Sequence, residues 1–396
     1  MKDRKPKVAV LERNEYYEKI SAGLGILQVV LFLALFAFVV LSFFRNTDLI
    51  TYRNFYYFFK DLNASAESVD VFASDSVSYP TSDEQSFTLY RQGLAVAGNG
   101  SVTVFTATGR QTVSETIQYH TPTAVGAGKY LLVYEMGGMQ YSLYNSYTQI
   151  FSGKTDFPIY GAAASDSGMY ALLTRSEEYT SVVSLYDSNF KLINRYSKNG
   201  YVTDVAIHEK GSRIAIPVTE SADGVLRTTL TLYEPRKSDS GITVELGNSL
   251  PLSCAFTQNG GVSLLSTDGV RFVSSNGKSV TERLFDGRAI ACASLDSEGA
   301  VIALRAPDAA GQNEVLVYGQ NGELQLSHRT EELPEQIARA ENAVFYLTRR
   351  GIVRLDVKSG EADLYACHTD HKQLLAVGGD EVLLCSPQKA DYIRFS

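Results

Sequence analysis

The chain opens with a hydrophobic pattern unlike that of the rest. From Ile20 to Phe44 no residue is charged, and nearly all are aliphatic or aromatic. At ~1.5 Å per residue, a helix of this length exceeds the ~30 Å hydrocarbon core of a bilayer. The stretch runs into Arg45 without the small-x-small site of a cleaved signal peptide. We therefore expect residues 20–44 to form a transmembrane helix that is kept as an anchor.

Positive charge is distributed unevenly around this stretch. Only Arg45, Arg53 and Lys60 follow it closely, whereas six basic residues precede it, namely Lys2, Arg4, Lys5, Lys7, Arg13 and Lys19. Loops rich in Lys and Arg stay on the cytoplasmic side of a membrane. The pattern predicts residues 1–19 to be a cytoplasmic tail and everything after Arg45 to be extracytoplasmic.

Residues 45–64 connect the apolar stretch to the remainder of the chain. Thr47 and Asp48 suit a helix N-terminus, and apolar side chains then recur at helical spacing, at Leu49, Tyr52, Tyr56, Phe59 and Leu62. We expect a membrane-proximal helix or stem. Its aromatic side chains suit the bilayer interface and contact with a globular domain equally well.

Beyond residue 64 the chain repeats one unit of four short strands. The third strand has the form V-x-V-Y and leads into a turn; it recurs at Val102 to Arg110, Val182 to Lys191, Val270 to Lys278, Val315 to Glu323 and Ile352 to Glu361. Turns with Gly follow the first strand, as in ASDSGM, HEKGS, TQNGG and DSEGA. The first strands themselves carry small residues, which suit crowding around a central axis.

The units start near Ser86, Thr121, Ile159, Tyr201, Pro251, Ala289, Leu333 and Lys372. These spacings approach the ~40 to 50 residues of a propeller blade. Seven units are complete and the eighth lacks a strand, which the segment Ser68 to Ala73 is expected to supply, closing the ring. We therefore predict that residues 65–396 form an all-β, WD40-like or quinoprotein-like β-propeller of seven or eight four-stranded blades. A β-sandwich explains the repeat less well.

Composition narrows the range of partners. The net charge of -8 and a pI near 5.3 give no basic surface for nucleic acid. The chain contains no Trp, whereas quinone-cofactor and outer-membrane-assembly propellers usually dock their blades with Trp, so similarity to those propellers is weak.

Several stretches together resemble a known family. They are the basic tail, the apolar span, Y-x-N-F-Y-Y-F-F-K-D-L at Tyr52 to Leu62, and the unit containing SDSGMYALLTRSEEYTSVVSLYD at Ser165 to Asp187. This pattern resembles a family of Gram-positive, membrane-anchored propeller proteins catalogued as a domain of unknown function. The resemblance implies a fold and a cell-surface location, and it carries over no catalytic residue.

The sequence lacks the common motifs of catalytic, phosphate-binding and metal-binding sites. It has no G-x-S-x-G elbow, P-loop, H-E-x-x-H or C-x-x-C motif. We expect no catalytic residue and no cofactor. Cys367, His368, Asp370 and His371 form one metal-ligand-type cluster, for which a polar surface loop is the simpler interpretation.

The cysteines leave one covalent question open. Cys254 and Cys292 occupy matching places on the first strands of neighbouring units, which would bring them close enough for a disulfide outside the cell. Burial as small apolar side chains is the favoured alternative, because a disulfide needs strict geometry.

A closed ring would gather the loops after the second strands on one face. These loops carry the residues we predict to bind a partner, namely Arg175, Tyr179, Arg227, Arg305, Arg349 and Arg350. Arg engages carboxylates, phosphates and carbonyls through paired hydrogen bonds. The sequence favours a binding or scaffold module of the cell envelope, with the lipid bilayer and an envelope protein or cell-wall glycan as partners. The alternative is a propeller enzyme, a lyase or glycan-acting hydrolase, with its site in the central channel.

Overall fold

The computed structural model describes residues 24–34, 36, 75–237, 241–308, 311–367 and 373–395. The chain divides into two compact units, Met1–Leu62 and Asn63–Ser396. Residues 24–34 of the first unit are helical. Within the described ranges, no helix is long and apolar enough to cross a membrane. The predicted tail, the remainder of the span at 20–44, the stem at 45–64 and the strand Ser68 to Ala73 lie outside the described residues.

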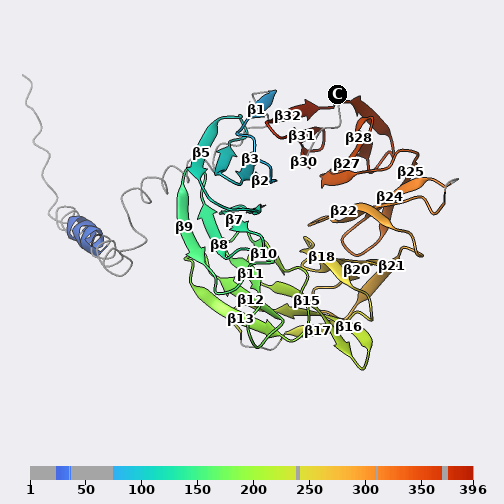
Figure 1. Ribbon diagram of the computed structural model, residues 1–396. Coiled ribbons are helices and arrows are strands. Elements are labelled where there is room, and N and C mark those ends of the chain that lie inside the picture. The colour runs from blue at the N-terminus through green and yellow to red at the C-terminus, as the bar shows by residue number, and fades with distance from the viewer. Residues whose placement is uncertain are drawn as a thin grey trace, which may run out of the picture. The chain divides into compact units, whose positions relative to one another are not determined.

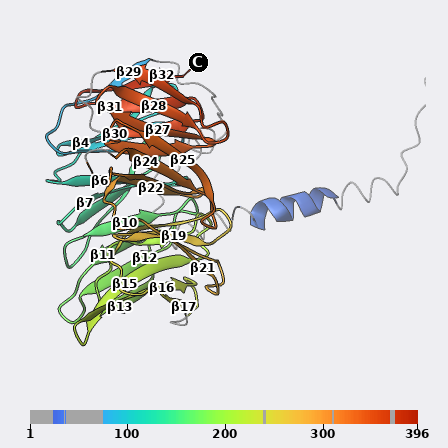
Figure 2. The same cartoon turned by 90° about the vertical axis from the view of Figure 1, so that its right-hand side faces the viewer.

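The second unit is an eight-bladed β-propeller, shown along its axis in Figure 1 and from the side in Figure 2. Blade 1 holds β2 (Gln85–Tyr90), β3 (Gly93–Gly98), β4 (Ser101–Phe105) and β5 (Gln111–Thr116). Blade 2 holds β6 (Pro122–Gly126), β7 (Leu131–Glu135), β8 (Gln140–Tyr144) and β9 (Gln149–Lys154). Blade 3 holds β10 (Gly161–Ala164), β11 (Tyr170–Thr174), β12 (Ser181–Tyr186) and β13 (Leu192–Lys198). Blade 4 holds β14 (Ala206–Ile207), β15 (Ile214–Ala222), β16 (Val225–Tyr233) and β17 (Ile242–Glu245).

The other half of the ring repeats this order. Blade 5 holds β18 (Pro251–Phe256), β19 (Val262–Ser266), β20 (Gly269–Val273) and β21 (Val280–Leu284). Blade 6 holds β22 (Ile290–Asp296), β23 (Gly299–Leu304), β24 (Asn313–Tyr318) and β25 (Leu324–Thr330). Blade 7 holds β26 (Gln336–Ala340), β27 (Ala343–Thr348), β28 (Gly351–Asp356) and β29 (Ala362–Ala366). Blade 8 holds β30 (Gln373–Gly378), β31 (Glu381–Cys385), β32 (Lys389–Arg394) and β1 (Ser76–Ser78). The predicted propeller is confirmed, with eight four-stranded blades.

The ring closes through a strand from the N-terminal side of the propeller, as expected. That strand is β1, which pairs antiparallel with β32 through Ser76↔Asp391, Val77↔Ala390 and Ser78↔Lys389. It lies a few residues after the predicted segment Ser68 to Ala73. Because β1 comes from one end of the propeller sequence and β32 from the other, their pairing leaves no gap between blades 8 and 1.

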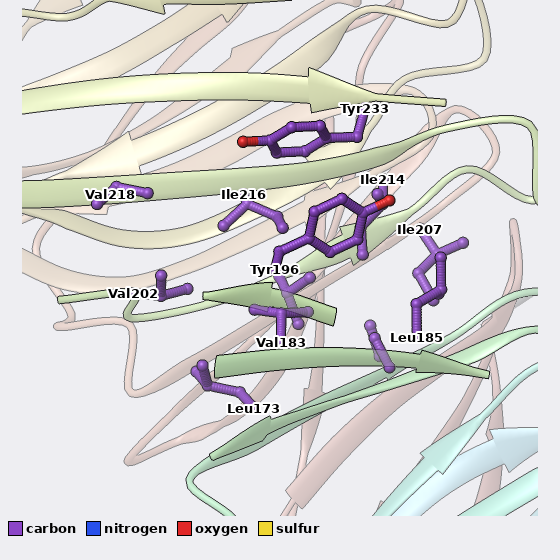
Figure 3. Close-up of a cluster of buried hydrophobic side chains, with 13 residues drawn as sticks. Leu173, Val183, Leu185, Tyr196, Val202, Ile207, Ile214, Ile216, Val218 and Tyr233 are labelled. Atoms are coloured by element: carbon purple, nitrogen blue, oxygen red, sulfur yellow. The ribbon is translucent and has the colours of Figure 1, made fainter. Parts of the chain in front are cut away.

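Among the described residues, one buried apolar cluster lies at each of the eight interfaces between blades. Figure 3 shows the cluster between blades 3 and 4, where Val183 and Leu185 face Ile214 and Ile216. Second strands such as β3, β7 and β11 are buried along their whole length because each lies between two neighbouring blades. The outer strand β29 is exposed throughout.

Tyrosine takes part in the docking of blades 2 and 3. Tyr141 of blade 2 lies with its ring centroid 6.0 Å from that of Tyr170 in blade 3. Phe151 and Phe190 stack at 4.7 Å in the same region. Aromatic pairs of this kind add about 0.5–1.5 kcal/mol beyond the area they bury. The blades thus pack through aromatic rings although the chain contains no Trp.

Cys254 and Cys292 do not occupy matching places. In β18, Ser253 pairs with Leu265 after a bulge, and in β22 Cys292 pairs with Ala303 after the same bulge. Cys292 therefore aligns with Ser253, one residue before Cys254. Successive side chains of a strand point to opposite faces, so Cys254 packs between blades 4 and 5 and Cys292 between blades 6 and 7. All four cysteines are free thiols, and the expected proximity of Cys254 and Cys292 is wrong.

The propeller has two distinct faces. In each antiparallel blade, the loop after the second strand and the connection to the next blade lie at the same end. The backbone bonds from Gly137 to Ile159 and from Ile159 to Gly138 join two such segments in blade 2. We call this end the loop face. The opposite end, which carries the turns after the first and third strands, is the turn face.

Candidate partner-binding site

The six residues predicted to bind a partner come from four blades and belong to the loop face. Arg175 and Tyr179 lie between β11 and β12, and Arg227 lies near the tip of the β15–β16 hairpin. Arg305 follows β23, while Arg349 and Arg350 form the turn between β27 and β28. All six side chains are exposed. The topology thus brings them to one face, spread around the ring.

The arginines differ in their surroundings. Arg350 Nε lies 2.9 Å from Glu332 Oε1, and Arg349 Nε lies 3.7 Å from Glu335 Oε1. Arg227 stands opposite Glu220 in the β15–β16 ladder. Such exposed pairs contribute little to stability. These arginines are therefore available to exchange an intramolecular carboxylate for one on a partner.

Arg175 and Tyr179 belong to a segment, residues 175–180, with a cavity on each side. The cavity toward blade 4 has a volume of ≈ 550 Å³, and that toward blade 2 has a volume of ≈ 540 Å³. Both volumes fall within the ~300–1,000 Å³ typical of ligand sites. Residues 174–179 contribute to both cavities. Two of the predicted residues, Arg175 and Tyr179, therefore line cavities on the loop face.

Three tyrosines line the cavity toward blade 4, namely Tyr160, Tyr179 and Tyr201. Tyr160 precedes blade 3, Tyr179 lies within it and Tyr201 follows it. Sequence reasoning selected Tyr179 alone. The signal for the other two is their position: each is a large aromatic in a connection that the repeat places on the loop face.

Local hydrogen bonds hold the backbone at each tyrosine. The Tyr179 N–H donates to Ser176 Oγ at 3.0 Å, and the Ser176 N–H donates to the Tyr179 carbonyl at 3.0 Å. The Tyr160 N–H donates to the Leu173 carbonyl at 2.8 Å. Tyr201 and Thr219 exchange two backbone hydrogen bonds, at 2.8 and 2.9 Å. The cavity therefore has a fixed backbone frame with exposed aromatic side chains.

A third cavity, of ≈ 530 Å³, opens at the centre of the ring on the turn face, where Asp166, Asp204, Glu209 and Asp296 line it. Most of these carboxylates accept backbone hydrogen bonds. Asp204 accepts from the N–H groups of Val205 at 2.8 Å and Cys254 at 2.9 Å. Asp166 accepts from Gly128 N–H at 2.6 Å.

Asp296 closes its own turn by accepting from Glu298 N–H at 2.7 Å and Gly299 N–H at 3.0 Å. Burial raises the pKa of Asp204, and burial likewise raises the pKa of Asp296. These hydrogen bonds give Asp166, Asp204 and Asp296 a structural role in holding the backbone around the opening. Sequence reasoning did not anticipate that the ring would bring them around one opening.

Of the candidate metal cluster, only Cys367 is described. It is half-buried against the core between blades 7 and 8, and burial raises its thiol pKa. His368, Asp370 and His371 lie outside the described residues. Within the described ranges, no group of three or more His, Cys, Asp or Glu side chains is arranged to hold a metal ion.

Comparison with known proteins places this architecture in a family. Residues 67–395 match the model of DUF5711, described as a family of unknown function. The chain belongs to DUF5711. The match spans the propeller and agrees with the resemblance seen in the sequence. No curated protein matches this DUF5711 chain.

Solved structures resemble the DUF5711 propeller in fold. Sqt1 from Saccharomyces cerevisiae has a TM-score of 0.60 at 10% identity, covering 81% of this chain and 98% of its own. Sqt1 from Chaetomium thermophilum, solved bound to the N-terminus of the ribosomal protein L10, has a TM-score of 0.56 at 11% identity, covering 81% and 100%. BamB from Moraxella catarrhalis has a TM-score of 0.52 at 11% identity, and the match covers 81% of this chain and 99% of BamB. At these identities the likeness concerns the fold alone.

Proposed function

We propose that this protein is a membrane-anchored, extracytoplasmic binding or scaffold module of the cell envelope. Its partner is an envelope protein or a cell-wall glycan held on the loop face. The observation that carries the proposal is the separation of two ends of the propeller: the chain enters at the turn face, and the hollowed, exposed segment 175–180 lies on the loop face.

The positions of residues 75 and 395, at the two ends of the described propeller sequence, are consistent with this arrangement. The Tyr392 N–H donates to the Asp75 carbonyl at 2.9 Å, which places residue 75 beside the end of β32. The Phe395 N–H donates to the carbonyl of Asp380, in the turn after β30, at 2.8 Å. Residues 75 and 395 therefore both lie at the turn face. The described propeller sequence therefore begins and ends away from the loop face, on which segment 175–180 lies.

The central opening favours binding over catalysis. A general acid or base needs a proton-transferring atom directed at a substrate. Asp166, Asp204 and Asp296 instead accept hydrogen bonds from backbone N–H groups. The loop-face module is for this reason preferred to a lyase or hydrolase in the channel. In Sqt1 of C. thermophilum the same fold holds a peptide terminus, which is consistent with a non-catalytic role.

Photo-crosslinking in cells tests the proposal. A photoreactive residue at position 179 on the loop face should capture a partner. The same residue at Lys210, an exposed turn-face position, should capture far less. Capture from Lys210 alone, or from neither position, would contradict a loop-face binding role.

Protease protection tests the anchor and its orientation separately. Protease added to intact, wall-stripped cells should degrade the chain after Arg45 and leave the segment from Lys2 to Lys19 protected. Degradation of the propeller only in opened cells would show that the proposed orientation is wrong.

A further inference from the structure

The cavity between residues 175–180 and blade 4, hereafter the tyrosine groove, has an unusual surface for this protein. Tyr160, Tyr179 and Tyr201 line it with exposed fractions of 47%, 38% and 69%. Elsewhere Tyr144 and Tyr170 are almost fully buried in the cores between blades. Exposed aromatic rings from three consecutive loop-face segments around one cavity indicate a ligand that covers them.

The polar lining of the groove is nearly balanced in charge. Arg175 is its one cationic side chain, and Glu177 and Glu178 are its carboxylates. Ser176 and Thr180 add hydroxyl groups at the same cavity. The groove thus offers hydrogen-bond donors and acceptors together, without the positive field that a polyanion requires.

We infer that the tyrosine groove binds a neutral, hydroxyl-rich oligosaccharide. The inference rests on the proposed function and names the chemical class of its partner. The face of an aromatic ring is negatively polarised and attracts the C–H groups on one side of a sugar ring. Sugar hydroxyls both donate and accept, which matches a lining of one guanidinium, two carboxylates and several hydroxyls. The fixed backbone at all three tyrosines reduces the entropy lost when a flexible chain binds.

The groove suits a sugar better than an extended peptide. Peptides that bind by strand addition require a free strand edge. β11 at this site is already paired on both sides, with β10 and β12. The net charge of -8 for the whole chain also disfavours an acidic polymer.

Titration of the full-length protein in detergent with a tetrasaccharide of β-1,4-linked N-acetylglucosamine tests the inference. We expect binding by calorimetry, and saturation transfer from protein to sugar C–H protons. Replacing Tyr160, Tyr179 and Tyr201 together with Ala should weaken binding at least about tenfold. The three lost aromatic contacts are together worth at least the free energy of a tenfold change in affinity. The matched control Tyr365→Ala, an exposed tyrosine on β29, should leave binding unchanged.

The triple replacement of the same tyrosines with Phe separates ring stacking from the hydroxyl groups. It should retain most of the affinity, because the ring faces remain. Absence of tetrasaccharide binding, or equal weakening by Tyr365→Ala, would overturn the inference. A proline-rich peptide that binds the groove in place of the sugar would overturn it as well. Capture of a partner from position 179 alongside any of these three results would leave the proposed loop-face function standing.

Discussion

The rings of Tyr170 and Tyr186 stack within blade 3, with centroids 4.8 Å apart and an interplanar angle of 6°. The two residues are directly opposite each other in the β11–β12 ladder. Their rings continue toward Tyr141 of blade 2, whose centroid lies 6.0 Å from that of Tyr170. This cross-strand pair within blade 3 therefore forms part of the contact with blade 2.

Tyr170→Ala should destabilise the propeller strongly. The side chain is 1% exposed, so its removal leaves a cavity and should cost about 3–5 kcal/mol of unfolding free energy, as for other large buried aromatics. Tyr365→Ala is at a partly exposed site on the outer strand β29, where the ring lies 6.2 Å from that of Phe395. This change should lower the unfolding free energy by no more than about 1.5 kcal/mol. Denaturant unfolding followed by circular dichroism measures both. Similar small losses in the two variants would show that the stack does not dock the blades.

A buried arginine predicts how stability depends on pH. Arg271 donates to both oxygens of Asp268, at 3.0 and 3.1 Å, and to Glu282 at 3.0 Å. These hydrogen bonds from Arg271 lower the pKa of Asp268. Because the folded pKa lies below the unfolded value of about 3.9, the stabilisation is present above that pH and is lost as pH falls through the folded pKa.

Asp268→Asn should therefore cost about 1–3 kcal/mol at pH 7, toward the lower end because the Asp268 side chain is 46% exposed. The difference from the unaltered protein should shrink below about pH 4. Unfolding free energies across this range provide the measurement. Asp363→Asn, at an exposed partner of Arg354, is the control and should show little change at either pH. A pH-independent cost for Asp268→Asn would rule out an electrostatic origin.

Ring closure depends on the short strand β1. Val77 is 5% exposed and packs in the core between blades 8 and 1, whereas its neighbour Ser76 is exposed. Val77→Asp buries a charge and should cost several kcal/mol. Since it also frees an edge of β32, it should promote association between molecules. Ser78, on the other side of Val77, is also exposed and pairs with Lys389. Ser78→Asp is therefore the matched control and should stay monomer-like in light scattering, with little change in thermal stability. Equal behaviour of the two variants would mean that β1 does not secure the ring.

The cysteines should behave as buried thiols. Burial raises the pKa of the Cys254 and Cys385 thiols, and it raises the pKa of Cys292 to about 12. A thiol reagent at pH 8 should therefore label Cys254 and Cys385 only after unfolding. Cys385→Ser should cost about 1–3 kcal/mol because it buries a hydroxyl. A reducing agent should leave the melting temperature unchanged, and a fall on reduction would reveal a disulfide.

The repeat was readable from sequence because each blade repeats its strands and glycine turns. The turns at Gly168, Gly211 and Gly260 all adopt a positive φ, as their spacing required. Side-chain direction was harder to predict, because the bulges in β18 and β22 set the register, and a shift of one residue turned Cys254 and Cys292 to opposite faces. The tyrosine groove depends on three connections meeting around one cavity. The local sequence pattern does not show which connections lie next to one another in space, so it did not identify Tyr160 and Tyr201 as lining residues.

Substitution of the predicted arginines tests whether a partner covers the whole loop face or only the tyrosine groove. Arg175 lines the tyrosine groove, whereas Arg227, Arg305, Arg349 and Arg350 lie on blades 4, 6 and 7. Replacing these four with Gln should change the unfolding free energy by less than about 1 kcal/mol, because all four side chains are exposed and the ion pairs of Arg349 and Arg350 contribute little. If the partner covers the whole loop face, photo-crosslinking from position 179 should weaken and the remaining capture should become less sensitive to salt. A double Tyr160→Ala, Tyr201→Ala variant provides the comparison, since it removes groove contacts, keeps these charges and leaves position 179 for the photoreactive residue. Full capture by the arginine variant, with loss in the tyrosine variant, would contradict the arginine prediction and confine the partner to blades 2 to 4.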